Sequence, residues 1–67
     1  MSNQTDDYQI KVLRDFNTAA KLILLAEDTK ENKIIELDAL LKEISNQYGY
    51  FNYLFKAYHT IKTQINE

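Results

Sequence analysis

Cysteine and proline are absent from this sequence, and glycine and histidine each occur once. Without cysteine the chain has no disulfides and no thiolate metal sites. The single histidine, His59, cannot build a metal site without help from carboxylates. Because β-rich folds need turn residues many times over, the shortage of glycine and proline excludes an all-β fold. We therefore predict an all-α protein with no metal and no other cofactor.

The chain also lacks the patterns that usually mark an enzyme or a nucleic-acid-binding protein. It has no serine–glycine elbow, no second histidine and no glycine-rich phosphate loop, so we predict no catalytic or cofactor-binding residues and no small-molecule substrate. The formal net charge is −2, and the charges are spread through both halves of the chain. A nucleic-acid binder would carry a basic face. We therefore expect no nucleic-acid partner.

Long apolar runs are missing too. The longest, residues 22–26, has five residues, far fewer than a bilayer-spanning helix needs, so we predict no membrane partner. The first residues, MSNQTDD, are polar and acidic, unlike a secretory signal, and this favours a cytoplasmic protein. Asparagine, isoleucine, lysine and tyrosine are frequent and arginine occurs once, a bias typical of an A+T-rich genome such as that of a low-G+C bacterium or its phage.

One stretch, residues 34–65, dominates the hydrophobic pattern. Its apolar residues recur at alternating steps of three and four, and only Lys62 is out of place: Ile34, Leu37, Leu41, Ile44, Tyr48, Phe51, Phe55, Tyr58 and Ile65. This heptad predicts a long packed helix over about residues 33–65. A second line, formed by Leu40, Leu54 and Ile61, borders the first, which suits one face of a helical bundle.

An earlier helix is predicted over about residues 5–28, after a frayed N-terminus of residues 1–4. Thr5 can cap this helix, and Asp6 and Asp7 suit the positive end of its dipole. Its apolar seam is Leu13, Phe16, Ala20 and Ile23.

Seven polar residues, 27–33, separate the two helices. Asp28 and Glu31 have capping-box spacing, as do Thr29 and Asn32 more weakly. The apolar positions of the two helices are in phase, so one continuous helix is the alternative. We favour a loop with an antiparallel return, because a lone helix would leave its apolar seam bare.

Gly49 is the other possible break. Because the heptad runs through it without a phase change, we interpret Gly49 as a close-packed position in an unbroken helix, with a kink as the alternative. All 67 residues then form one small domain, an antiparallel two-helix hairpin that completes a helical bundle by association.

The hairpin predicts which residues meet a partner. The first helix would be about 36 Å long and the second about 49 Å, so the end of the second helix would have no partner within the chain. Leu22 and Leu25 lie on the polar face of the first helix, and Tyr50 and Tyr53 on outer positions of the second. We therefore expect another protein surface to cover these residues. The predicted partner-binding residues are Leu22, Leu25, Tyr50, Tyr53, Tyr58, Ile61 and Ile65.

Residues 36–41, Glu-Leu-Asp-Ala-Leu-Leu, resemble part of the signature of the small two-helix aspartyl-phosphate phosphatases of the sporulation phosphorelay. That resemblance implies a phosphorylated response regulator as substrate and Asp38 as the catalytic acid. Ile34 and Ile35 stand where the family has Ser-Gln, and the loop glycine of the family is missing here. In size and hairpin shape the chain is also similar to the co-chaperones that hold type III secretion needle subunits.

Taken together, these patterns favour a small non-enzymatic protein–protein interaction module: a regulator, an inhibitor or a co-chaperone. The expected partner is another protein, a second copy of the chain in a homodimer, or both. The alternative function is the two-helix phosphatase with Asp38 as its reactive acid.

Overall fold

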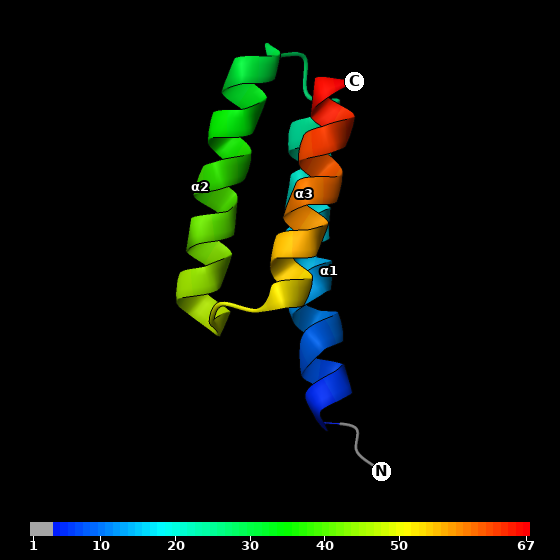
Figure 1. Cartoon of the computed structure of the whole chain (residues 1–67), viewed down its shortest axis with the longest axis vertical. Coiled ribbons are helices and arrows are strands. Elements are labelled where there is room, and N and C mark those ends of the chain that lie inside the picture. The colour runs from blue at the N-terminus through cyan, green and yellow to red at the C-terminus, as the bar shows by residue number, and fades with distance from the viewer. Residues whose placement is uncertain (1–3) are drawn as a thin grey trace.

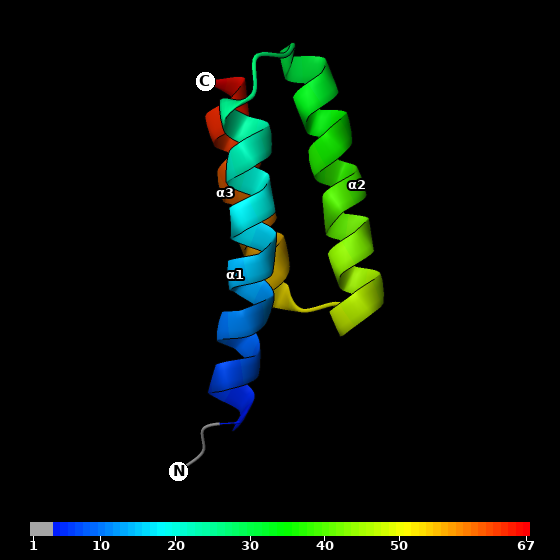
Figure 2. The ribbon, with the colours of Figure 1, turned by 180° about the vertical axis from the view of Figure 1, so that it is seen from behind.

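The computed structural model describes the backbone of residues 4–67 and the side chains of residues 7–67. Three helices follow one another: α1 (Gln4–Leu25), α2 (Lys30–Tyr48) and α3 (Asn52–Asn66). They run up, down and up, so that α2 is antiparallel to both α1 and α3 (Figure 1). The N-terminal end of α1 extends past the turn between α2 and α3 (Figure 2).

The all-α prediction is confirmed, but the two-helix hairpin is wrong. The chain is a compact three-helix bundle of 44 × 20 × 16 Å, in which each helix packs against the other two. Residues 1–3 of the predicted frayed end lie outside the described residues, and Gln4 already belongs to α1. The predicted cap by Thr5, with Asp6 behind it, concerns side chains that are not described.

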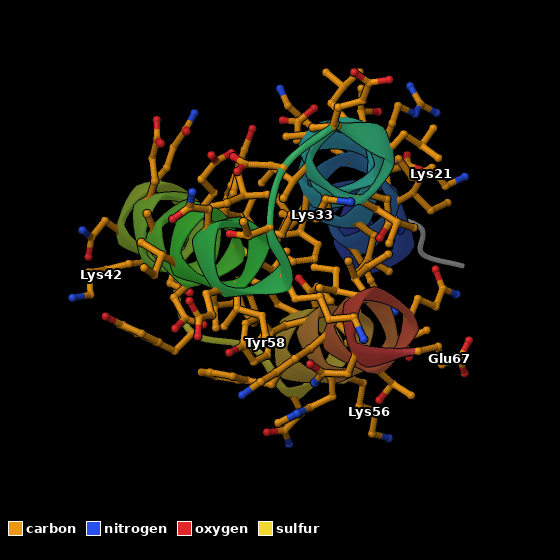
Figure 3. All side chains as sticks on the ribbon, turned by 90° about the horizontal axis from the view of Figure 1, so that it is seen from above. Lys21, Lys33, Lys42, Lys56, Tyr58 and Glu67 are labelled. Atoms are coloured by element: carbon orange, nitrogen blue, oxygen red, sulfur yellow. The ribbon has the colours of Figure 1, made fainter. Side chains whose placement is uncertain are left out.

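The core runs along the centre of the bundle, where the three helices form the corners of a triangle (Figure 3). Every helix contributes at least one large side chain that is fully buried: Phe16 from α1, Leu37 from α2 and Leu54 from α3. The whole buried apolar set is Val12, Phe16, Ala20, Leu37, Ile44, Leu54, Tyr58, Ile61 and Ile65. A third helix therefore supplies the surface that a hairpin alone would have needed from a partner.

The turn between α1 and α2 is stabilised by the side chains of its own residues. Thr29 is the N-cap of α2, and its Oγ1 accepts a hydrogen bond from the backbone N–H of Asn32 at 3.1 Å. The carboxylate of Asp28 accepts from the Asn32 side chain at 2.9 Å and from the Thr29 N–H at 2.8 Å. These hydrogen bonds lower the pKa of Asp28, and the hydrogen bond from Asn32 lowers it most. Of the two predicted capping pairs, the weaker one, Thr29 with Asn32, forms the cap.

The same turn also satisfies the end of α1. The Lys33 ammonium donates to the main-chain carbonyl of Leu24 at 2.8 Å, where the last turn of a helix leaves carbonyls without partners. The helices therefore meet about three residues earlier in the sequence than predicted, with α1 ending at Leu25 and α2 beginning at Lys30.

Gly49 ends α2, so the prediction of an unbroken helix over residues 33–65 is wrong. Its φ is +118°, in the region that favours glycine. A Cβ at this position would lie 3.2 Å from the Phe51 ring, closer than a side chain normally packs. The Gly49 N–H still donates to the Ser45 carbonyl at 2.7 Å, which closes the last turn of α2 before the chain reverses.

The reversal folds α3 back onto α1 and α2. It buries Tyr58, Ile61 and Ile65, which were predicted to overhang the hairpin and meet a partner. The predicted overhang is therefore wrong, because it required a helix that passed straight through Gly49.

An aromatic end cluster closes the bundle at the turn between α2 and α3. Its members are Tyr8, Tyr48, Phe51 and Tyr53. The Tyr8 ring meets the Tyr48 and Phe51 rings edge to face, at centroid distances of 5.8 and 5.9 Å, and Phe51 stacks on Tyr53 at 5.0 Å. The cluster joins the N-terminal part of α1 to both helices that meet at the turn.

Candidate functional site

Among residues 7–67, the most exposed large apolar side chains belong to Leu22 and Leu25, which are 70% and 78% exposed. Both lie near the C-terminal end of α1, three positions apart, and therefore on one side of that helix. We call them the leucine pair. The core is complete without them, since the buried residues of α1 are Val12, Phe16 and Ala20. Their exposure therefore reflects the surface of the folded chain and not an unfinished core.

A second apolar surface lies at the other end of the bundle, beside the turn between α2 and α3. Tyr50, 68% exposed, stacks on Phe55, 36% exposed, with ring centroids 6.3 Å apart and an interplanar angle of 15°. We call these two residues the turn surface. Tyrosine and phenylalanine side chains lose little conformational entropy when they are covered, which makes them effective contact residues.

The predicted partner-binding residues thus divide into three groups. Leu22, Leu25 and Tyr50 lie at the surface. Tyr53 is half-buried, with its ring stacked on Phe51 in the aromatic end cluster, and burial raises its pKa. The third group, Tyr58, Ile61 and Ile65, belongs to the core. The leucine pair and Tyr50 are at opposite ends of the bundle, so the structure does not bring them together (Figure 1).

Phe55 is a surface residue that the sequence pattern placed in the seam. The signal that could have revealed it was Lys62, seven residues further on and the only polar residue in the predicted seam. Both residues stand beside the line that α3 buries, Leu54, Tyr58, Ile61 and Ile65. A charged residue in a seam after a glycine indicates that the buried face has rotated.

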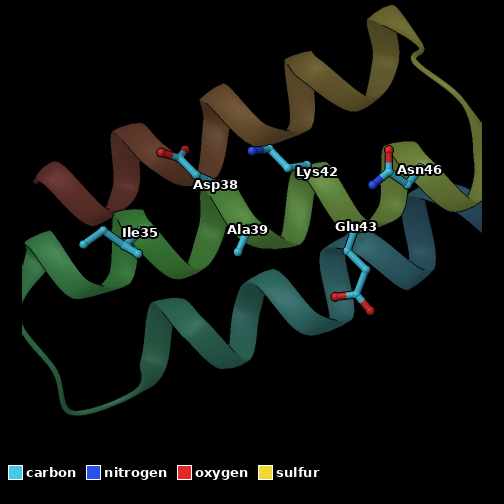
Figure 4. A pocket seen from close by; sticks show the side chains of 6 residues that line it. All are labelled: Ile35, Asp38, Ala39, Lys42, Glu43 and Asn46. Atoms are coloured by element: carbon cyan, nitrogen blue, oxygen red, sulfur yellow. The ribbon is translucent and has the colours of Figure 1, made fainter.

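The outer face of α2 carries a shallow hollow of about 500 Å³. Six residues line it, and all of them come from α2: Ile35, Asp38, Ala39, Lys42, Glu43 and Asn46. Asp38 and Lys42 point to the α3 side, whereas Glu43 points to the α1 side (Figure 4). Ligand sites are usually enclosed by several elements. A stripe along one helix, with the small side chain of Ala39 at its middle, suits contact with a flat partner better than enclosure of a small molecule.

Asp38 and Tyr58 form a polar contact between α2 and α3. The Tyr58 hydroxyl, in a residue that is 8% exposed, donates a hydrogen bond to the Asp38 carboxylate. This hydrogen bond, followed by burial, raises the pKa of Tyr58 to about 12. The Asp38 carboxylate thus helps hold α3 in place. The two-helix hairpin that the phosphatase resemblance implied is not the fold found here.

His59 and Lys62 surround the same tyrosine. The His59 ring meets the Tyr58 ring edge to face at 5.1 Å, and the Lys62 ammonium lies 5.6 Å from the ring centroid. Among residues 7–67, whose side chains the structure describes, no group of three or more His, Cys, Asp or Glu side chains is arranged to hold a metal ion. No helix in this part of the chain is long and apolar enough to span a membrane.

Comparison with models of known protein families, with curated proteins and with solved structures finds no match for this chain.

Proposed function

We propose that the chain is a small non-enzymatic interaction module that binds another protein, acting as a regulator, an inhibitor or a co-chaperone. The observation that supports this most is the exposure of the leucine pair on a bundle whose core is already complete. Fully covering a leucine side chain stabilises a complex by about 1.5–3 kcal/mol. A partner that covers Leu22 and Leu25 gains that free energy without disturbing the fold.

The surroundings of the leucine pair are those of a binding surface. Thr18 and Lys21 are also exposed on the C-terminal half of α1, so polar side chains border the apolar centre. An apolar centre with a polar rim is the usual anatomy of a protein–protein interface. The leucine pair is the primary contact in this proposal, and the turn surface is a separate contact at the other end of the bundle.

The proposal is tested by removing the apolar side chains while the fold is kept. Leu22→Asp with Leu25→Asp places two carboxylates on the leucine pair, and Thr60→Asp with Thr63→Asp, at exposed positions three apart on α3, adds the same charge elsewhere as a matched control. Proteins retained by the immobilised wild-type chain and by the control are identified, purified and titrated against all three chains. We expect the leucine variant to lose at least about tenfold in affinity, since each lost leucine contact is worth more than 1 kcal/mol.

Unchanged affinity of the leucine variant would overturn the leucine pair as the contact surface. The same titration with Tyr50→Asp then decides whether the turn surface carries the binding. Sedimentation equilibrium of the wild-type chain alone reports whether a second copy is itself a partner.

A further inference from the structure

Five apolar residues stand seven positions apart along α2, the turn and α3: Leu37, Ile44, Phe51, Tyr58 and Ile65. Four of them are buried and Phe51 is half-buried. A turn imposes no shared register on the helices at its two sides. A continuous helix packed along its length does, because a heptad keeps one face toward its neighbours. The sequence of residues 30–66 therefore fits a single long helix as well as the two helices observed.

The segment that separates α2 from α3 is short. It consists of Gly49, Tyr50 and Phe51. Gly49 has a φ of +118°, and Phe51, the N-cap of α3, makes no side-chain capping hydrogen bond. Straightening this segment would add three helical residues and would release the backbone conformation that only glycine adopts readily.

A straightened segment would carry α3 away from its own bundle. The face formed by Leu54, Tyr58, Ile61 and Ile65 would then be bare, as would the α1 and α2 surfaces that it covers. Only a second copy of this chain offers the identical pair of surfaces. Short hinge segments of this kind are the usual origin of domain-swapped dimers.

We propose that α3 exchanges between two copies of the chain. In the exchanged dimer, residues 30–66 of each copy form one helix, and each α3 packs on α1 and α2 of the other copy. Every core contact of α3 is regained, including the hydrogen bond from Tyr58 to Asp38, which then joins two chains. Gly49 favours the closed form, because glycine tolerates the turn and is a poor helix former.

The exchange of α3 is independent of the proposed function. The exchanged helix uses core residues, whereas the leucine pair on α1 stays exposed in both forms. A failure of the exchange therefore leaves the leucine pair to be judged by its own experiment.

The first test is Gly49→Ala. Alanine is strained at a φ of +118°, its Cβ would meet the Phe51 ring at 3.2 Å, and it favours a helix at this position. We expect the dimer dissociation constant from sedimentation equilibrium to fall by about tenfold or more relative to the wild-type chain. Helicity measured by circular dichroism should rise as the segment becomes helical. A Gly49→Ala chain that is folded and stays monomeric over the same concentrations would overturn the proposal.

The second test keeps Gly49 and reads out the exchange itself. Lys30 lies beside the C-terminal end of α3, where its ammonium donates to the Asn66 carbonyl at 3.1 Å. Because the chain has no cysteine, Lys30→Cys copies can be mixed with Asn66→Cys copies, incubated at high concentration and treated with a short thiol-to-thiol crosslinker that spans the length of the lost lysine side chain. Exchange brings the two cysteines within reach of the crosslinker between copies, so we expect a covalent dimer to accumulate.

Two controls show whether this crosslink arises from exchange of α3. Lys30→Cys mixed with Lys56→Cys reports collisions between exposed cysteines, since residue 56 lies in the N-terminal part of α3. Insertion of several glycine and serine residues after Gly49 relaxes the turn and should suppress the Lys30–Asn66 crosslink. Crosslinking no faster than the collision control, or unaffected by the insertion, would overturn the exchange.

Discussion

The hydroxyl of Tyr8 donates a hydrogen bond to the main-chain carbonyl of Tyr48, 2.9 Å away and forty residues later in the chain. The carbonyl belongs to the last turn of α2, where helical partners are missing. In return, the Tyr48 hydroxyl donates to the carboxylate of Asp15 on α1 at 2.5 Å, and this hydrogen bond raises the pKa of Tyr48. The two tyrosines thus fasten α1 to the end of α2 just before the chain turns.

Tyr8→Phe removes the first of these hydrogen bonds and keeps the ring in the aromatic end cluster. We expect the free energy of unfolding to fall by about 0.5–1.5 kcal/mol, as for a typical intramolecular hydrogen bond. Urea unfolding followed by circular dichroism measures this change. Tyr50→Phe is the matched control, since Tyr50 is 68% exposed, and it should change the free energy by less than about 0.5 kcal/mol. Equal effects of the two variants would contradict the role given to Tyr8.

Truncation of two leucines should separate the core from the proposed binding surface. Leu54 is fully buried and Leu25 is 78% exposed. Leu54→Ala should lower the free energy of unfolding by about 2–5 kcal/mol, because it leaves a cavity among the three helices. Leu25→Ala should change it by less than about 0.5 kcal/mol. A large loss at Leu25 in dilute protein would show that this side chain belongs to the fold.

Thr29→Ala should test the cap of α2. The substitution removes the oxygen that accepts from the Asn32 N–H, and we expect a loss of about 0.5–2 kcal/mol in the free energy of unfolding. Thr18→Ala, at an exposed position within α1, is the matched control and should not destabilise the chain. The two variants are compared by thermal and urea unfolding.

Stability should fall at high pH because of Tyr58. Its pKa is about 12 in the folded chain and about 10 when unfolded, so the unfolded chain loses this proton first. The contribution of Tyr58 is therefore fully present below about pH 10 and is lost as the pH rises toward about 12, by up to about 2 kcal/mol. Urea unfolding at a series of alkaline pH values, compared with Tyr58→Phe, measures it.

Asp38→Asn is the companion variant. Removing the carboxylate should move the Tyr58 pKa back toward about 10, because the hydrogen bond to Asp38 is the largest cause of the shift. Tyrosinate absorbance during an alkaline titration reports this change. An unchanged titration would contradict the Tyr58–Asp38 contact. The same variant tests the predicted catalytic role of Asp38, since loss of aspartyl-phosphate hydrolysis would support the phosphatase.

The helical class and most of the core could be predicted from the sequence. The periodicity of Phe16, Leu37 and Ile44 depends only on local helix geometry, and these residues are buried. The turn before α2 was located because polar residues with capping side chains interrupt the pattern. The same helical periodicity predicts the exposure of Leu22 and Leu25, since both lie on the side of α1 opposite its apolar seam.

The break at Gly49 could not be predicted from periodicity, because the seven-residue spacing from Ile44 to Phe51 to Tyr58 continues through it. Tertiary packing decides whether the helix is continuous or broken. Folding α3 back buries Leu54, Tyr58 and Ile65 within one chain, whereas a straight helix would leave them bare. The exposed Tyr50–Phe55 stack was missed for the same reason, since the surface around a turn depends on where the turn is.

The measurement that tests this account most directly is a nuclear Overhauser spectrum of dilute, monomeric protein, read at the side chains of Asp38 and Tyr58. In a continuous helix these residues would be about 30 Å apart, twenty positions at 1.5 Å each. We expect a clear cross-peak between the Asp38 β protons and the Tyr58 ring protons, because α3 folds back onto α2. Absence of that cross-peak, with helical chemical shifts running through Gly49, would contradict the three-helix bundle and return Tyr58, Ile61 and Ile65 to the surface.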